Sequence, residues 1–260
     1  MSGNNTTTAK FLDQLKINYG PRELLSRYFE KAVNAAASRG VYLELGTFDK
    51  LMEVNRQNLD TWHPMTTSFN PEYCHLDELN SFAILGRDYQ GEIVATQGAR
   101  FLDWHDTEFV SEATSLRFFY DDPSHDRAQG ECCFATAPET TAITGRLMHS
   151  GGIWYRSDYR GLKLGEIIPR TARAYAYTTW NIDQAFGITT MENVSKKFHL
   201  RVGYREVAGR VTMRRSPTFP EGDLELILCR LAKIDLIDDL FGFLVDFDPE
   251  VQTEVFSRRA

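Results

Sequence analysis

The sequence predicts an α/β (α+β) protein in which a mixed β-sheet carries helices on its faces. Three observations support this prediction. Strand-like and helix-like segments alternate in the second half of the chain, a glycine-bearing loop joins one strand directly to a helix, and no internal repeat or low-complexity tract interrupts the order. The length of 260 residues is sufficient for such a sheet together with an added helical piece.

A helical N-terminal extension, residues 1–39, is expected to precede a main domain that spans residues 40–260. We expect the polar opening through Thr8 to be frayed. The firmest helix of the extension starts at Pro21 and ends near residue 38, because apolar side chains recur there at helical spacing and a glycine follows. Proline fits the first helical position, since the N–H that it lacks would be unpaired there in any case.

The main domain is predicted to begin with a strand at residues 41–45 and a helix from Thr47, as N-cap, to Leu59. The stretch 60–79 that follows is long for a plain connection and rich in aromatic residues. We expect it to be ordered and to form one wall of a substrate cleft. Trp62, His63 and Tyr73 are the candidates to line that cleft, although aromatic residues in a long loop often serve only to fix the loop in place.

A β-hairpin is predicted next, with strands at residues 82–86 and 93–97 and a glycine-containing turn between them. The second strand is expected to extend toward Trp104. Residues 105–140 have a weaker pattern, from which we expect one helix between Glu108 and Tyr120 and then a polar, turn-rich connection.

A long strand from Ala142 to Tyr155, with a bulge at its Gly-Gly step, is predicted to lead through a short loop into a helix from Leu164 to Tyr177. The remaining predicted elements are a strand at 186–190, a helix at 192–202, strands at 204–213 and 224–232, and an apolar helix at 234–245. The last helix and the N-terminal helix are expected either to cover a sheet edge or to form a contact in a homodimer.

Net charge, apolar runs and the spacing of cysteines and histidines argue against several classes of function. A net charge of −7 argues against a nucleic-acid partner, because the surface as a whole repels phosphates. No apolar run is long enough to span a membrane or to serve as a signal peptide, so we expect a cytoplasmic protein. The four cysteines and six histidines have no metal-binding or redox spacing, so no metal is predicted.

The loop from Arg160 to Gly165 is the candidate anion site. Where a strand enters a helix through a glycine-bearing loop, the first N–H groups of the helix are unpaired and its dipole favours an anion. The segment reads Arg160-Gly161-Leu162-Lys163-Leu164-Gly165, which is neither a dinucleotide-binding nor a nucleoside-triphosphate-binding pattern. By itself it is also compatible with glycines that only tighten a turn.

This loop resembles the pyrophosphate loop of the GNAT superfamily of acyl-CoA-dependent N-acyltransferases, which reads Arg or Gln, two residues, Gly, one residue, then Gly or Ala. Arg160 and Gly165 fill the outer positions, and Gly161 repeats the common Arg-Gly start. Lys163 stands where the inner glycine is usual. Its side chain must therefore point away from the phosphates or pair with them.

A second segment, Phe198 to Tyr204, is similar to the end of the next helix of that family, because it closes with the Gly-aromatic pair Gly203-Tyr204. Asn193 lies near the start of the same predicted helix, about where the family often has asparagine. The two resemblances together cover residues 151–207, and the extension has no counterpart that we recognise. They imply a mixed, mostly antiparallel twisted sheet of the GNAT type and an acyl-CoA co-substrate, with acetyl-CoA expected.

The resemblance also implies a chemistry. The coenzyme's pantetheine arm would enter a gap between the strand ending at Tyr155 and the strand at 187–190, with its amides on the backbone of Ile153 and Tyr155. An amine of a small molecule or protein would attack the thioester directly. A long-chain acyltransferase, and a non-catalytic acyl-CoA-binding sensor, remain alternatives.

His199 stands where many relatives have a tyrosine that protonates the departing thiolate. The resemblance therefore makes it the candidate general acid, with a rate that falls as the pH rises through its pKa. The alternative is a histidine on a helix surface with no catalytic role. His149 and Glu166 are candidates for the base, each with a structural alternative, and a chain of water molecules often does that work in the family.

Overall fold

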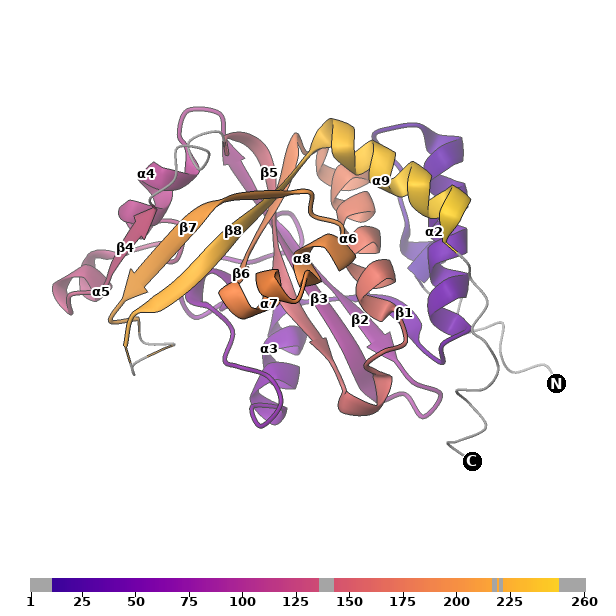
Figure 1. Cartoon of the computed structure of the whole chain (residues 1–260), viewed down its shortest axis with the longest axis horizontal. Coiled ribbons are helices and arrows are strands. Elements are labelled where there is room, and N and C mark those ends of the chain that lie inside the picture. Colours follow the sequence, from indigo (N-terminus) through magenta and orange to yellow (C-terminus); the bar gives the residue numbers. More distant parts are fainter. Residues whose placement is uncertain (1–10, 136–142, 217–218, 220–221, 248–260) are drawn as a thin grey trace.

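A computed structural model describes residues 11–135, 143–216, 219 and 222–247 of the chain. In this part, eight strands form one sheet in the order β1-β2-β3-β5-β6-β8-β7-β4, seen in Figure 1. Neighbouring strands are antiparallel except β5 and β6, which are parallel. The mixed, mostly antiparallel sheet flanked by helices is therefore confirmed. The strands are β1 (Tyr42–Gly46), β2 (Ser81–Arg87), β3 (Ile93–Trp104), β4 (Cys132–Ala135), β5 (Gly145–Tyr155), β6 (Gln184–Thr190), β7 (Glu206–Arg214) and β8 (Leu224–Ala232).

Helices cover both faces of the sheet. On one face α6 (Leu164–Trp180) packs against β3, with α2 (Arg22–Ala37) and α9 (Lys233–Asp246) beside it (Figure 1). On the other face α3 (Phe48–Gln57) packs against β2 and β3. Shorter helices are α4 (Phe109–Thr114), α5 (Ser124–Ala128), α7 (Met191–Ser195) and α8 (Phe198–Arg201). Among the described residues, no helix is both long enough and apolar enough to cross a membrane.

Strand β2 contributes side chains to the hydrophobic cores on both faces of the sheet. Phe82 and Ile84 belong to the main core under α6, whereas Ala83 and Leu85 belong to the smaller cluster under α3. Successive side chains of a strand point to opposite faces, so a strand that is apolar throughout can be buried on both. The apolar run 82–85 has this property.

The N-terminal extension shares the main core. Leu25, Tyr28 and Phe29 of α2 are fully buried in the cluster that also holds the apolar face of α6. Tyr28 packs against Phe243 of α9, with ring centroids 5.3 Å apart. Because α9 lies on α2 and α6, its outer face leaves Ile234, Phe241 and Val245 exposed. The opening through Thr8, expected to be frayed, lies outside the described residues.

Two predicted helices differ from the structure because residues other than glycine adopt the left-handed conformation. The helix expected from Glu108 to Tyr120 is only α4, which ends before Leu116, where φ is +63°. The helix expected at 192–202 is divided into α7 and α8 at Lys197, where φ is +56°. Such breaks are hard to predict, since the sequence has no glycine at either position. Strand β4 was also missed, in the segment expected to be a turn-rich connection.

Candidate functional site

The parallel strands β5 and β6 separate after three residue pairs. They pair at Leu147 with Gln184, at Met148 with Ala185 and at His149 with Phe186. Beyond this point β5 continues along β3 as far as Tyr155, and β6 continues along β8 as far as Thr190. The backbone edges of the two strands that face each other are therefore left open.

A bulge in β5 helps to turn the strand away from β6. The register between β3 and β5 shifts between Thr96 and Gly98, opposite the Gly-Gly step. Gly152 has a φ of +61°, which an L side chain rarely adopts, and its carbonyl accepts a hydrogen bond of 2.9 Å from Thr96 Oγ1. This is the bulge that the two glycines predicted.

The open edge of β5 presents the backbone of Ile153 and Tyr155. Trp154 pairs with Thr96, and the N–H of Arg156 donates to the Val94 carbonyl over 2.9 Å, so these alternate residues face β3. In an antiparallel ladder the residues between them direct their N–H and C=O groups to the other side. Ile153 and Tyr155 therefore have backbone groups on the side of the gap, where the Tyr155 carbonyl already accepts a hydrogen bond from Arg160 Nε.

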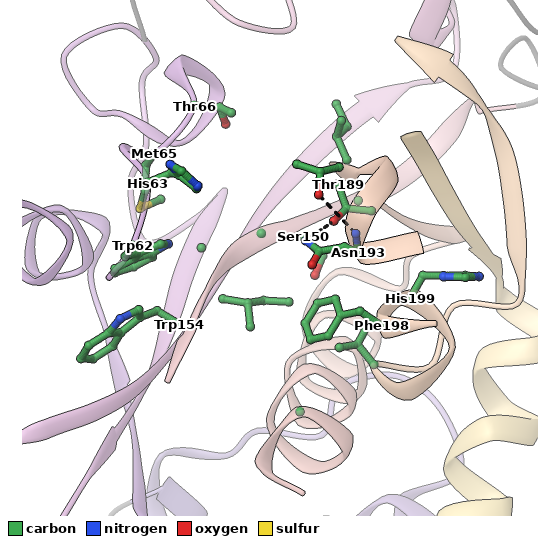
Figure 2. A pocket seen from close by; sticks show the side chains of 18 of the residues that line it. Trp62, His63, Met65, Thr66, Ser150, Trp154, Thr189, Asn193, Phe198 and His199 are labelled. Carbon is green, nitrogen blue, oxygen red and sulfur yellow. Dashed lines mark hydrogen bonds between the residues drawn. The ribbon is translucent and has the colours of Figure 1, made fainter. Parts of the chain in front are cut away.

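A cavity of about 850 Å³ occupies this gap. Figure 2 shows Trp62, His63 and Met65 on one side of it, facing Asn193 and Phe198 on the other. Of the predicted cofactor residues, the cavity wall contains Ile153, Tyr155, Arg160, Gly161, Lys163, Leu164, Gly165 and Asn193, together with the predicted His63, His149, Glu166, Trp62 and His199.

Two residues expected at the site lie elsewhere. Leu162 is buried in the main core and does not line the cavity. Tyr73, expected in the cleft, packs edge-on against Tyr120 with ring centroids 5.5 Å apart and does not line the cavity either. That expectation was wrong because the long loop turns back at Tyr73: the N–H of Asp121 donates to the Tyr73 carbonyl over 3.0 Å. Only the first part of the loop reaches the cavity.

The loop that begins α6 offers free backbone donors. Within the described parts of the chain, no N–H group of residues 161–165 has a hydrogen-bond acceptor; the first paired one belongs to Glu166, which donates to the Lys163 carbonyl over 2.9 Å. Gly161 and Lys163 have φ values of +83° and +58°. These unpaired donors lie at the positive end of a 17-residue helix, which favours an anion.

Lys163 has a backbone conformation that favours glycine. Its left-handed conformation costs an L residue on the order of 1 kcal/mol, and glycine adopts it freely. The residue is exposed and lines the cavity.

The side chain of Arg160 braces the loop. Its Nε donates to the Tyr155 carbonyl over 3.1 Å and its Nη2 to the Thr61 carbonyl over 3.4 Å. It thereby ties the end of β5 to the segment that carries Trp62, whose ring stacks on that of Trp154 at 5.8 Å.

Asn193 is held at the other wall by the end of β6. Its Nδ2 donates to Thr189 Oγ1 over 2.9 Å, and its N–H donates to Thr190 Oγ1, which caps α7. Asn193 and Thr189 on this wall and Ser150 of β5 all line the cavity (Figure 2). A ligand that enters between the strands would pass between these side chains.

His199 lines the cavity, but Figure 2 shows its ring directed away from the other labelled side chains, beyond Phe198. The residue is buried, and this burial lowers the pKa of the imidazole below its ordinary value of 6.5. At neutral pH the uncharged form of the ring is therefore favoured.

His149 is enclosed by aromatic rings. It stacks on Phe69 at 4.2 Å and on Phe186 at 4.9 Å, and its Nε2 is 3.4 Å from Ser68 Oγ. Burial lowers its pKa well below the ordinary range, so the ring is neutral. Glu166 is half-buried on the cavity wall at the start of α6.

Sequence reasoning missed two polar groups at the point of separation, Ser150 and the hydroxyl of Tyr204. Both are buried and line the cavity. Tyr204 had been noted only as the aromatic residue after Gly203. Its approach to β5 depends on which strands pair, which no local pattern in the sequence indicates.

No protein-family model matches the sequence, and no curated protein matches it. Solved structures of acetyltransferases are similar in fold. NAA60 of Arabidopsis thaliana, in complex with acetyl-CoA, is 10% identical with a TM-score of 0.46, over 74% of this chain and 99% of that chain. The ribosomal-protein-S5-alanine acetyltransferase of Vibrio fischeri is 14% identical with a TM-score of 0.43, over 76% and 95%. The aminoglycoside acetyltransferase AAC(6')-Ib, with coenzyme A and kanamycin, is 11% identical with a TM-score of 0.42, over 76% and 98%. With identities and TM-scores this low, the likeness by itself carries no inference about what this chain binds.

Proposed function

We propose that the protein is an acyl-CoA-dependent N-acyltransferase of the GNAT type, which moves an acyl group, acetyl in the first instance, from coenzyme A to an amine. One observation carries the proposal. Four of the five residues 161–165, whose N–H groups are unpaired among the described residues, line the same cavity that separates β5 from β6. A diphosphate site and a slot with free backbone edges are thus joined, as a coenzyme with a diphosphate and an amide-bearing arm requires.

In this proposal the N–H groups at the start of α6 bind the diphosphate, with Lys163 adding a charge. The pantetheine arm lies along the open edge of β5, where the backbone groups of Ile153 and the N–H of Tyr155 hydrogen-bond to its amides, since the Tyr155 carbonyl is bound by Arg160. The thioester then lies near Ser150, where the strands meet. A backbone N–H at the thioester carbonyl would stabilise the oxyanion that forms when the amine attacks.

Direct attack by the amine on the thioester is consistent with the residues that line the cavity. Among the described lining residues there is one cysteine, Cys229, and burial raises the pKa of its thiol to about 12. Such a thiol is protonated at neutral pH and is a poor nucleophile. An acyl-cysteine intermediate is therefore not part of the proposal.

The wall on the side of the long loop favours apolar groups. Trp62, Met65, Phe69 and Phe119 lie there, and Glu166 is the single carboxylate among the described lining residues. A cluster of ammonium groups would have little to pair with. This wall supports the second candidate, transfer of a longer acyl chain, which would bury its methylene groups against these rings.

The proposal is tested by two substitutions at Gly165. A Cβ there would meet no atom closer than 3.8 Å, so both Gly165→Ala and Gly165→Asp should fold. A carboxylate in the first turn is favourable for the helix but repels a diphosphate. We expect Gly165→Asp to weaken acetyl-CoA binding at least about 10-fold by calorimetry, while Gly165→Ala binds like the wild type.

Two results would count against the proposal: no binding of any acyl-CoA by the wild type, or equal binding by Gly165→Asp. Titration with acetyl-CoA and with longer acyl-CoAs separates the two donor candidates, since preference for a long chain alone would displace acetyl. Tight binding without turnover over a broad panel of amines would identify a sensor.

A further inference from the structure

We propose that Tyr204 is the proton donor to the thiolate that leaves when the thioester is cleaved, and that Arg173 beneath its ring is a positioning residue that stabilises the tyrosinate. This inference rests on the proposed function and names a group for a step that any thioester aminolysis requires.

The hydroxyl of Tyr204 lies where β5 and β6 separate. A Cβ built on Gly187 of β6 would be 2.9 Å from Tyr204 Oη and 3.0 Å from the carbonyl oxygen of Ser150 in β5. The phenol thus reaches the point of separation from the side of α6, on a backbone held by a 2.9 Å hydrogen bond from its N–H to the His199 carbonyl.

This hydroxyl is available to a ligand. It is buried and lines the cavity, and its polar neighbours there are the side chains of Ser150 and Arg173, which both lower its pKa. Ser150 also lines the cavity, so the hydroxyl and this neighbour border the same space. A sulfur atom that arrives between the strands would meet this hydroxyl.

Arg173 provides a positive charge next to the Tyr204 ring, which would stabilise the tyrosinate left after proton donation. The side chain is completely buried in α6, and its guanidinium lies 5.2 Å from the centroid of the Tyr204 ring. Its Nη2 donates to the Val202 carbonyl, and its Nη1 has no partner among the described residues. A buried guanidinium stays charged, so it favours a negative charge on the ring above it.

The carboxylate nearest to Arg173 is engaged elsewhere. Asp239 binds Arg170 through both its oxygens, at 2.9 and 3.1 Å, and is 3.7 Å from Arg173 Nη2. The positive charge of Arg173 is therefore only partly neutralised. Burial raises the pKa of Tyr204, which keeps the phenol protonated at neutral pH, while Arg173 opposes that shift.

Acyl transfer and proton transfer take place together in this step. The amine nitrogen bonds to the thioester carbon, and the C–S bond breaks with its electron pair going to sulfur. The proton of Tyr204 Oη moves to that sulfur, which gives free coenzyme A and a tyrosinate next to Arg173. The proton lost by the attacking nitrogen returns to the tyrosinate through water, which restores the phenol.

The test is Tyr204→Phe, which removes only the hydroxyl and keeps the ring on Arg173. Tyr28→Phe is the matched control, because Tyr28 is also a fully buried phenol but does not line the cavity. We expect Tyr204→Phe to lower kcat by about 100-fold or more, the usual size of a general-acid contribution, with acetyl-CoA affinity within about twofold of the wild type.

A second readout does not depend on turnover. The thiol of bound coenzyme A is titrated by the ultraviolet absorbance of its thiolate, in the wild type and in both variants. A hydrogen bond from Tyr204 stabilises the thiolate, so Tyr204→Phe should raise the thiol pKa by about one unit and Tyr28→Phe should leave it unchanged.

The outcomes are distinct. Coenzyme binding with an unchanged kcat and an unchanged thiol pKa in Tyr204→Phe would overturn this inference and leave the proposed function intact. If the wild type binds coenzyme A but acylates no amine, the thiol titration is the test: a thiol pKa that is unchanged in Tyr204→Phe would overturn this inference. If it binds no coenzyme at all, the proposed function fails and this inference fails with it.

Discussion

Arg39 donates a hydrogen bond from Nε to the carbonyl oxygen of Leu162 over 2.8 Å. This buried guanidinium follows α2 and is held in turn by the Ala35 carbonyl, 2.6 Å from its Nη1. In a planar trans peptide the C=O of one residue and the N–H of the next point in opposite directions. By holding the Leu162 carbonyl on the inner side, Arg39 directs the N–H of Lys163 outward, toward the cavity.

Replacing Arg39 should therefore weaken coenzyme binding from a distance. We expect Arg39→Met, which keeps the bulk of the side chain, to reduce the affinity for coenzyme A by about 10-fold, because the loop loses its brace. Lys31→Met is the control, since Lys31 of α2 donates its hydrogen bond to the Leu244 carbonyl of α9 and not to the loop. Equal affinities of the two variants, measured by calorimetry, would show that the loop holds its conformation without Arg39.

Lys163 combines an unfavourable conformation with a useful charge, and two variants separate these effects. Lys163→Gly relieves the left-handed strain and should raise the free energy of unfolding by about 1 kcal/mol. Lys163→Ala keeps the strain and should leave stability nearly unchanged. Both should weaken coenzyme A binding by about 5-fold at low salt and less at high salt, because both remove the charge. A salt-independent loss would point to a different cause.

The pH dependence of kcat distinguishes His199 from Tyr204 as the acid. A phenol with a raised pKa stays protonated, so we expect no fall of kcat between about pH 5 and pH 9. His199, with a pKa lowered by burial, would lose its proton as the pH rises through a value below 6.5, and kcat would then fall in the acidic part of that range. A fall of kcat with pH that disappears in His199→Gln would identify His199 as the general acid.

A buried carboxyl away from the cavity predicts how stability changes with pH. Glu131 accepts a hydrogen bond from the Tyr120 hydroxyl, and burial raises its pKa above 4.5. The folded protein then binds more protons than the unfolded chain between the two pKa values, so this group lowers stability as the pH rises through that window. Glu131→Gln cannot ionise.

We therefore expect Glu131→Gln to gain stability relative to the wild type as the pH is raised from about 4 to 8, in urea unfolding. Glu225→Gln, at an exposed carboxyl on β8, is the control and should show no such trend. A gain that does not vary with pH would mean that ionisation of Glu131 is not the cause.

The predictable part of this molecule is the part encoded by local patterns. The loop from Arg160 to Gly165, the bulge at Gly152 and the gap-facing backbone of Tyr155 follow from residue types and strand alternation. The hydroxyl of Tyr204 does not, because it reaches Gly187 only when β6, β7 and β8 pair in their actual order. Tyr73 was misplaced for a similar reason, since the course of a long loop depends on tertiary contacts.

The central claim is that the free N–H groups at the start of α6 receive the coenzyme's diphosphate. Nuclear magnetic resonance of protein labelled with ¹⁵N-glycine tests it directly, because Gly161 and Gly165 lie in the loop whereas Gly40 and Gly91 lie outside the cavity wall. We predict that coenzyme A shifts the amide resonances of Gly161 and Gly165 downfield and leaves those of Gly40 and Gly91 in place. Saturating coenzyme that leaves Gly161 and Gly165 unmoved would contradict the account.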